Sequence, residues 1–266
     1  MSSSAAPSDP VVLLERRGAV ALLQIARPKA LNAINQQVLT ELSAWVTEIA
    51  ADPSLRAVVL TGAGDRAFVA GADIAAMQHM NSAQAQAFSE YGSAVMQQLA
   101  DLPKPVIAAV NGFALGGGCE LALSCDMILA STRAKFGLPE VTLGVVPGFG
   151  GTQKLTRQIG RMAANRWILS GDVFSAEDAL RVGVAQELFP PEELLDKALA
   201  LAERMASRGP LALAAVKHLV DRGGDVPMPA AMAMEAKAFG DIFATADQKE
   251  GMAAFLAKRP AEFRGE

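Results

Sequence analysis

The sequence predicts an α/β core followed by a helical C-terminal region, and two patterns along the chain favour this fold class. In the first part, short apolar runs that are typical of buried strands alternate with segments whose apolar residues recur at helical spacing. From Gly150 onward, nearly every segment has helical spacing. The expected parts are a loose tail at residues 1–10, an α/β core at 11–200 and a helical region at 201–266, with the pattern changing near 190–205.

The first part of the chain should supply the strands of the core. It begins with two strands, at 11–16 and 19–26, joined by a turn at Gly18. Asn35 can cap the next helix, because apolar residues repeat at helical spacing from there to the stop at Asp52 and Pro53. The elements expected after it are a strand at 57–60, a loop and then a segment at 68–74, a helix at 83–99, a strand at 106–110, a helix from Gly116 to Ser124 and a strand at 127–130.

The second part should consist almost entirely of helices. They are expected at 152–159, 162–169, 176–182, 192–208, 211–221 and 230–255. In the first part the order of strand, helix, strand, helix and strand is that of a right-handed α/β unit. Alanine-rich helices near the C-terminus offer apolar faces with little to cover them, which favours packing between subunits.

Composition and charge exclude several classes of protein. The 266 residues include 51% hydrophobic residues, which is enough apolar material for a sizeable core. The formal net charge is -4 and the sequence pI is about 5.4, so no basic field is available to collect nucleic acid or an anionic membrane. No apolar run approaches the roughly 20 residues of a membrane-spanning helix. We expect neither a nucleic-acid nor a membrane partner.

The cysteines and histidines argue against disulfide and metal chemistry. Cys119 and Cys125 are the two cysteines, and their spacing fits neither a secreted disulfide framework nor a zinc site. His79 and His218 lie far apart in the sequence, without the spacing of metal ligands. Residues 1–10 lack the basic and apolar segments of a signal peptide. We therefore expect no metal and a reducing, cytoplasmic location.

Three loops place glycines or a carboxylate just after an expected buried strand, where α/β folds commonly hold ligands. They are Ala70-Gly71-Ala72-Asp73-Ile74, Gly112-Phe113-Ala114-Leu115-Gly116-Gly117-Gly118-Cys119-Glu120, and the stretch from Pro139-Glu140 to Pro147-Gly148-Phe149-Gly150-Gly151-Thr152-Gln153. In this order and spacing they resemble the crotonase (enoyl-CoA hydratase/isomerase) superfamily, and within it the enoyl-CoA hydratases. The resemblance extends from residues 27–33 to residues 247–259.

This resemblance implies a crotonase-like spiral of repeated ββα units followed by a helical C-terminal region that forms a homotrimer or a dimer of trimers. It implies an acyl-CoA substrate, with coenzyme A as part of that substrate and no separate cofactor. The backbone N–H groups of Ala72 and Gly117 would form an oxyanion hole for the thioester carbonyl, each worth about 3 kcal/mol. Taken alone, the glycine triplet could also be a flexible turn.

Two glutamates decide which reaction the resemblance implies. Hydration of a 2,3-double bond needs a water held at C3 and a proton delivered to C2, which two facing carboxylates manage together. By resemblance Glu140 exchanges the C2 proton and Glu120 activates the water, with the N–H of Gly148 as a further contact. Burial and mutual repulsion would raise their pKa values. Without the resemblance, Glu120 reads as a helix first-turn acid and Glu140 as an exposed loop acid.

Binding of the coenzyme A portion is assigned by resemblance to two segments and one distant lysine. They are Lys29 with Ala30 and Leu31, the segment with Ala70, Asp73 and Ile74, and Lys258 from a neighbouring subunit. Both lysines also fit an ordinary solvated role. Asp73 also fits a helix cap or a local salt bridge, as does Asp126.

Substrate length and alternative functions remain open at this point. The bulk of Phe149 beside the expected water site favours short or medium acyl chains, with the loop at 75–91 and Phe239 as further candidates for the acyl pocket. A double-bond isomerase of the same superfamily is the main alternative, and many of these work with one carboxylate at the position of Glu140. An RNA-binding relative is the remote alternative, which the acidic composition disfavours.

Overall fold

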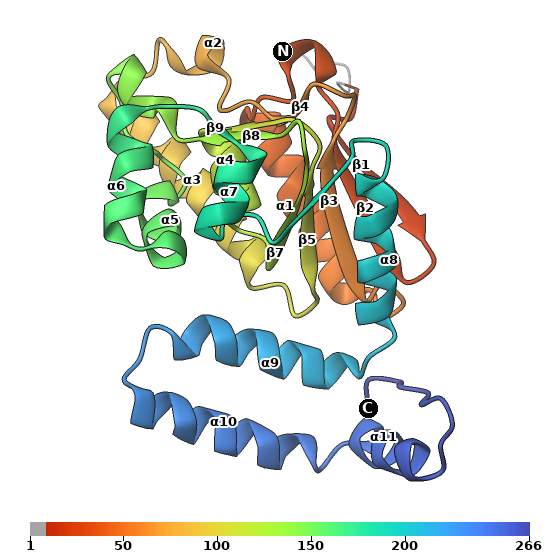
Figure 1. The fold of residues 1–266 in the computed structure, drawn as a ribbon. Coiled ribbons are helices and arrows are strands. Elements are labelled where there is room, and N and C mark those ends of the chain that lie inside the picture. The colour runs from red at the N-terminus through yellow and green to blue at the C-terminus, as the bar shows by residue number, and fades with distance from the viewer. Residues whose placement is uncertain (1–8) are drawn as a thin grey trace, which may run out of the picture.

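Two β-sheets of different size form the core, and the computed structural model describes residues 9–266 of the chain (Figure 1). Residues 1–8 of the predicted tail lie outside the described residues. Within these residues the larger sheet has six strands, in the order β1 (Val12–Arg17), β2 (Val20–Ile25), β3 (Ala57–Gly62), β5 (Val106–Val110), β7 (Met127–Ser131) and β10 (Glu187–Phe189). The smaller has four, in the order β4 (Ala67–Val69), β6 (Phe113–Leu115), β8 (Lys135–Gly137) and β9 (Phe174–Ser175).

The chain alternates between the two sheets. Each of the strands β3, β5 and β7 in the larger sheet is followed by a short strand of the smaller sheet, which is β4, β6 or β8, and then by helix. Neighbouring strands are parallel except in the pairs β1 with β2 and β8 with β9. The expected α/β fold class with repeated ββα units is therefore confirmed.

Helices cover both faces of the larger sheet, and the strand sequences explain why. Side chains alternate between the faces of a strand, and both faces of β3 are apolar. Val58 and Leu60 pack toward α1 (Gln36–Ala51) and α3 (Ser82–Ala100), whereas Ala57 and Val59 pack toward α8 (Leu194–Ala206). The side chain of Asn35 accepts a hydrogen bond from Val38 N at 3.0 Å, so the predicted cap of α1 is confirmed.

The remaining helices are short in the core and longer near the C-terminus. In the core they are η1 (Pro28–Ala30), α2 (Ile74–Met77), α4 (Gly117–Ala122), η2 (Pro139–Leu143), α5 (Gly151–Ile159), α6 (Arg161–Ser170) and α7 (Ala176–Val182). After α8 come α9 (Pro210–Gly223), α10 (Met228–Ile242) and α11 (Ala246–Leu256). None of the helices within residues 9–266 combines the length and apolarity that a bilayer crossing requires.

One predicted helix is wrong. The single helix expected at 230–255 is two helices, because the chain turns after Ile242 and Thr245 starts α11 by accepting a hydrogen bond from Gln248 N at 3.1 Å. The segment at 68–74, to which no type of element was assigned, is a strand as far as Val69 and continues through an isolated bridge between Ala72 and Ile34 into α2.

The C-terminal helices α9, α10 and α11 form a layer apart from the sheets (Figure 1). Helices α9 and α10 contain no buried residue in the single chain. Polar contacts join this layer to the core, such as Lys217 Nζ to Asp126 Oδ2 at 3.0 Å and an ion pair between Arg222 and Asp101 at 2.9 Å. The predicted boundary at residue 200 falls inside α8, which packs on the larger sheet.

Candidate active site

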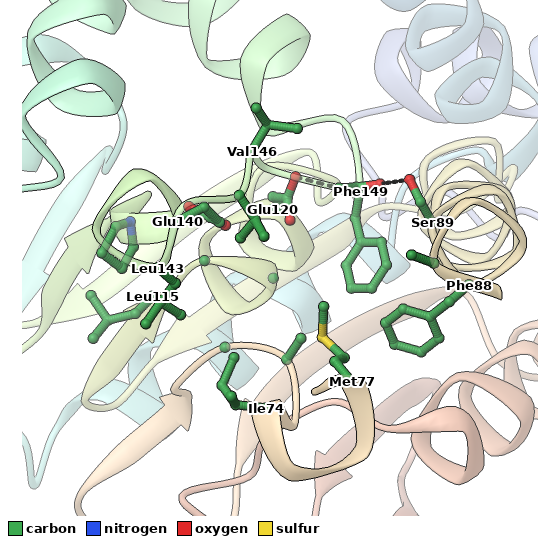
Figure 2. Close-up of a pocket in the computed structure, with 18 of the residues that line it drawn as sticks. Ile74, Met77, Phe88, Ser89, Leu115, Glu120, Glu140, Leu143, Val146 and Phe149 are labelled. Atoms are coloured by element: carbon green, nitrogen blue, oxygen red, sulfur yellow. Dashed lines mark hydrogen bonds between the residues drawn. The ribbon is translucent and has the colours of Figure 1, made fainter. Parts of the chain in front are cut away.

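The three loops singled out in the sequence form the walls of one cavity of about 360 Å³. The ends of β4, β6 and β8 bring these loops together, since the three strands are neighbours in the smaller sheet. Figure 2 shows the glutamates on one wall of the cavity, with apolar side chains around them. Of the predicted site residues, the cavity is lined by Ala70, Ala72, Ile74, Gly117, Glu120, Glu140 and Gly148.

The first wall is the segment that contains Ala72. In its bridge to Ile34, the hydrogen bonds are made by the neighbours of Ala72: Ile34 N donates to Gly71 O and Asp73 N donates to Ile34 O, both at 2.8 Å. In a parallel bridge this pattern leaves the N–H of the bridged residue outside the pairing. The backbone donor of Ala72 is therefore available on the cavity side.

An ion pair holds the Ala72 segment in place from behind. Arg27 donates to Asp73 Oδ2 at 2.9 Å, and Ala70 N donates to Leu31 O at 3.0 Å. Asn32 is fully buried and donates to Ala67 O at 2.8 Å, which ties the 27–34 segment to β4. Asp73 thus makes the local salt bridge that its sequence position allowed.

The second wall is the start of α4, where close packing requires glycine. A Cβ at Gly118 would lie 1.8 Å from Val69 O, so any side chain there would push α4 away from β4. Gly116 has φ +51, a conformation that favours glycine, and Gly117 is the first residue of the helix. The N–H of Gly117 has no partner within α4, because the first turn of a helix leaves its donors free. The triplet is a packed helix start and not a flexible turn.

Glu120 is held rigidly. It is only 1% exposed, and its Oε1 accepts hydrogen bonds from Phe149 N at 2.8 Å and Gly151 N at 2.7 Å, at the N-terminus of α5. Burial raises the pKa of Glu120, while these two N–H groups and the ammonium of Lys154 act in the opposite direction. The carboxylate is therefore a fixed acceptor whose charge is partly balanced.

Glu140 lies beside Glu120 in a different environment (Figure 2). It is in the first turn of η2, and its buried Oε2 has no hydrogen-bond partner among residues 9–266. Burial and, to a smaller extent, the charge of Glu120 together raise the pKa of Glu140 to about 7, against the opposing effect of a hydrogen bond from its own backbone. The meeting of the two glutamates, expected from resemblance, is observed in the fold.

Apolar side chains close the rest of the cavity. Phe149 packs edge-on against Phe88 with ring centroids 5.4 Å apart, and it fits against Gly92 so closely that a Cβ there would lie 2.2 Å from the ring. Gly148 O accepts hydrogen bonds from Ser89 at 2.5 Å and Ser93 at 3.2 Å, which fixes the loop before Phe149. The other apolar lining residues include Met77, Leu115, Leu143, Val145 and Val146.

Several predicted residues lie elsewhere in the single chain. Lys29 and Ala30 are exposed in η1, and Leu31 follows them, outside the cavity lining. Lys258 is exposed after α11, in the C-terminal layer. Phe239 is 68% exposed on α10 and does not line the cavity of its own chain, so its expected place in the acyl pocket is not found there.

Sequence reasoning missed residues that the structure places at or behind the cavity. Phe88 and Ser89 fall within the expected 75–91 segment but were not singled out, because the helical spacing of α3 did not indicate which side would meet the loops. The N–H of Gly151 and the side chain of Lys154 support Glu120 from α5. The helix start at Gly150 and Gly151 was the available signal for such donors, because helix N-termini favour carboxylates.

Comparisons with known proteins agree with this geometry. A family model described as Enoyl-CoA hydratase/isomerase matches residues 15–266. The chain is 48% identical over 252 residues to a crotonyl-CoA hydratase of Syntrophomonas wolfei, covering 95% of this chain and 97% of the relative. It is 47% identical over 251 residues to a short-chain-enoyl-CoA hydratase of Clostridium acetobutylicum, covering 94% and 96%.

Solved structures extend the similarity to three dimensions. An enoyl-CoA hydratase from Bacillus anthracis superposes with a TM-score of 0.94 at 37% identity, covering 96% of this chain and 100% of that one. Another enoyl-CoA hydratase structure, from Geobacillus kaustophilus, gives a TM-score of 0.91 at 44% identity and covers 96% and 98%. The family expected from the three loops is thus confirmed, and the chain belongs to the enoyl-CoA hydratase/isomerase family.

Proposed function

We propose that the protein is an enoyl-CoA hydratase, which adds water reversibly to a trans-2-enoyl-CoA and forms a 3-hydroxyacyl-CoA. The observation that carries this proposal is the pair of glutamates at one apolar cavity, of which Glu120 is held as an acceptor and Glu140 has a buried Oε2 with no hydrogen-bond partner among residues 9–266. The names of the relatives in Syntrophomonas wolfei and Clostridium acetobutylicum agree with the hydratase activity expected from the sequence.

Each group has a defined part in the proposed reaction. The thioester oxygen accepts hydrogen bonds from the N–H groups of Ala72 and Gly117, which stabilise the negative charge as it develops. The oxygen of a water bonds to C3 while Glu120 takes a proton from that water, and Glu140 donates its proton to C2. Because both carboxyl groups lie on one side of the cavity, the water adds to one face of the double bond. Dehydration runs through the same steps in reverse.

The second glutamate favours a hydratase over a double-bond isomerase. An isomerase moves a proton between two carbons and needs one carboxyl group for this task. Glu120 would transfer no proton in such a reaction, yet two backbone N–H groups hold its carboxylate at the cavity. A hydratase would use Glu120 to activate the water, so the arrangement favours a hydratase.

Short or medium acyl chains fit the apolar end of the cavity. Phe149 and Phe88 close this end. The ring of Phe149 already packs directly against Gly92, so it cannot move toward α3 without displacing that helix. The volume of about 360 Å³ is small for a site that must also admit the thioester and pantetheine end. We therefore propose a preference for short chains, as in the crotonyl-CoA and short-chain relatives.

Coenzyme A contacts beyond the cavity are also proposed. Lys29, Ala30 and Leu31 precede the segment that carries Asn32 and Ile34 behind the Ala72 loop, so they lie near its outer edge. We propose that Lys29 pairs with a phosphate of coenzyme A, with Ala70, Asp73 and Ile74 along the pantetheine and Lys258 supplied by a neighbouring subunit. Lys29→Met and Lys258→Met should each raise KM for the thioester with kcat kept; an unchanged KM contradicts that contact.

The neighbouring subunit is expected to cover the C-terminal layer. Large apolar side chains are exposed along α9, α10 and α11, among them Val220, Met228, Met232, Phe239, Phe255 and Leu256. Monomers rarely expose so much contiguous apolar surface. We propose a homotrimer or a dimer of trimers built on this layer. Light scattering on the eluting protein measures its mass, and a monomeric mass contradicts the proposal.

The two thiols support the cytoplasmic location that we propose. Cys119 and Cys125 are both free, and burial raises the pKa of each thiol, which keeps them protonated. Thiols that are buried and unpaired suit a reducing compartment.

The decisive experiment follows the ultraviolet absorbance of the conjugated thioester after purified protein is mixed with crotonyl-CoA. Rapid loss of absorbance in the wild type, together with its near absence in Glu140→Gln, supports the hydratase. A wild type without activity toward crotonyl-CoA and longer enoyl-CoA thioesters refutes it.

A further inference from the structure

A half-buried lysine lies behind Glu120, outside the catalytic cavity. Lys154 is on α5, one turn after Gly150, and its Nζ donates to Ser124 Oγ at 2.5 Å. The hydroxyl of Ser124 in turn donates to the carbonyl oxygen of Glu120 at 2.6 Å. A chain of two hydrogen bonds therefore connects the ammonium group to the backbone of a glutamate in the active site.

Helix α5 thus holds Glu120 at two points. The N–H groups of Phe149 and Gly151, at its N-terminus, bind the carboxylate, and Lys154 reaches the carbonyl of the same residue through Ser124. Helix α4 contains only six residues and also carries Gly117. Attachment of α4 to α5 therefore positions both the acceptor at Oε1 and the donor at the start of α4.

Lys154 also places a positive charge near the carboxylate of Glu120. Its ammonium opposes the effect of burial on the pKa of Glu120, and the charge of Glu120 raises the pKa of Lys154 against its own desolvation. The other titratable groups that face the pair are Glu140 of η2, Cys119 of α4, and Cys125 and Asp101 next to Lys154. Among these groups Lys154 is the cation.

A serine beside a lysine can also act as a nucleophile with the lysine as its base, but Ser124 and Lys154 are not suited to these roles. Ser124 is 3% exposed and lines neither the catalytic cavity nor the polar cavity of about 430 Å³ on the other side of Phe149. Its hydroxyl hydrogen is engaged by Glu120 O. No acyl group can reach the oxygen, so Ser124 transmits the position of Lys154 and is not itself a reactive group.

We infer that Lys154 is a positioning residue for hydration: acting through Ser124, it fixes the backbone of Glu120 on α4 and places a positive charge behind that residue. The inference rests on the proposed hydratase function. Loss of Lys154 should weaken water activation and leave thioester binding unchanged, because Lys154 does not touch the cavity. A purely structural lysine would change stability without changing the pH at which Glu120 ionises.

The test compares four variants for kcat and KM with crotonyl-CoA between pH 5 and 10, and for the midpoint of thermal unfolding. Lys154→Met removes the charge and keeps the stem. Lys154→Arg keeps the charge, and Ser124→Ala removes the hydrogen-bond link. Arg157→Met is the matched control, because Arg157 is one turn further along α5, has a side chain 63% exposed and lies outside the catalytic cavity.

Lys154→Met should lower kcat by about 10- to 100-fold, with KM within about twofold of the wild type. The acid limb of its kcat profile should move up by about one pH unit, since removing a neighbouring opposite charge raises the pKa of a carboxyl group. Lys154→Arg and Ser124→Ala should lose less kcat and keep the acid limb in place. Arg157→Met should match the wild type.

An acid limb that stays at the wild-type pH in Lys154→Met overturns the inference, whatever happens to the unfolding midpoint. If Lys154→Met does not fold, the test rests on Lys154→Arg. A shift of the acid limb in Lys154→Arg, which keeps the charge, would also overturn the inference. Failure of the wild type to hydrate crotonyl-CoA or longer thioesters is a different result, which refutes the proposed function itself.

Discussion

The two elements that carry the glutamates, α4 and η2, differ in how firmly they are held in the fold. Glu120 is on a helix whose residues are all buried, and its carboxylate is bound by two N–H groups. Glu140 is on η2, which has no buried residue, and its Oε2 has no partner among residues 9–266. A firmly bound carboxylate suits a base that must orient water, whereas an unbound carboxyl group with a raised pKa suits an acid that gives up its proton. Four predictions test this contrast.

The largest expected effect is on turnover. Glu120→Gln and Glu140→Gln each remove proton transfer and keep the size of the side chain, so each should lower kcat by about 10²- to 10⁴-fold. Steady-state hydration of crotonyl-CoA measures this loss, and binding of a saturated acyl-CoA provides the control for an intact site. Turnover close to that of the wild type in either variant means that its assigned role is wrong.

The second effect, on stability, should distinguish α4 from η2. Glu120→Ala leaves the N–H groups of Phe149 and Gly151 buried without an acceptor and should lower the free energy of unfolding by about 2 to 4 kcal/mol. Glu140→Ala breaks no hydrogen bond of Oε2 and should change it by less than about 1 kcal/mol. Urea unfolding of both variants at one protein concentration compares them, and equal losses would remove the contrast.

The third effect is on the pH dependence of the rate, which should fall with rising pH for hydration and rise with it for dehydration. The pKa of Glu140 is raised to about 7, so its proton is present below that pH and is lost above it. Hydration uses the protonated form and should slow about tenfold per pH unit above about 7, whereas dehydration should speed up as pH rises to that value. The same carboxyl group favours the folded state at low pH, and this contribution fades as pH rises through 7. Rate profiles in both directions with the same slope would contradict the assignment.

The smallest effect is on chain length. Phe149→Leu should open the closed end of the cavity and improve kcat/KM for an eight-carbon over a four-carbon thioester by about 10-fold. Val146 also lines the cavity but is 73% exposed, so Val146→Thr should leave this ratio within about twofold. Rates with a series of enoyl-CoA thioesters measure both, and an equal ratio in the two variants would show that the Phe149 wall does not set the length.

The sequence predicted most helices and the strands β1, β2, β3, β5 and β7 of the larger sheet because their residues repeat with a clear period, whereas β10, with three residues, was missed. The smaller sheet was missed, apart from its place near the glycine loops, since β9 has two residues and β6 and β8 have three each, too few to show alternation. The break between α10 and α11 was missed for another reason: alanine and methionine continue across the helices, and Thr245 is the sole local stop.

The candidate site depended more on family resemblance than on any local pattern. Nothing in the chain indicates that Glu120 and Glu140, twenty positions apart, meet in space; the neighbouring strands β6 and β8 bring them together. Lys154 carried no pattern at all, because a lysine on an amphipathic helix is expected to be solvated. The distance between α4 and α5 decides its role, and that distance is set by tertiary packing.

The glycine at position 92 of α3 can influence which substrates fit, although Gly92 itself does not line the cavity. Gly92 is absent from the lining of the cavity, yet the ring of Phe149 occupies the space where its side chain would be. A single added methyl group on the far side of that ring would have to be accommodated by moving the ring into the space for the acyl chain. Selection for a new substrate could therefore act through a helix position that looks neutral when only the residues around the substrate are compared.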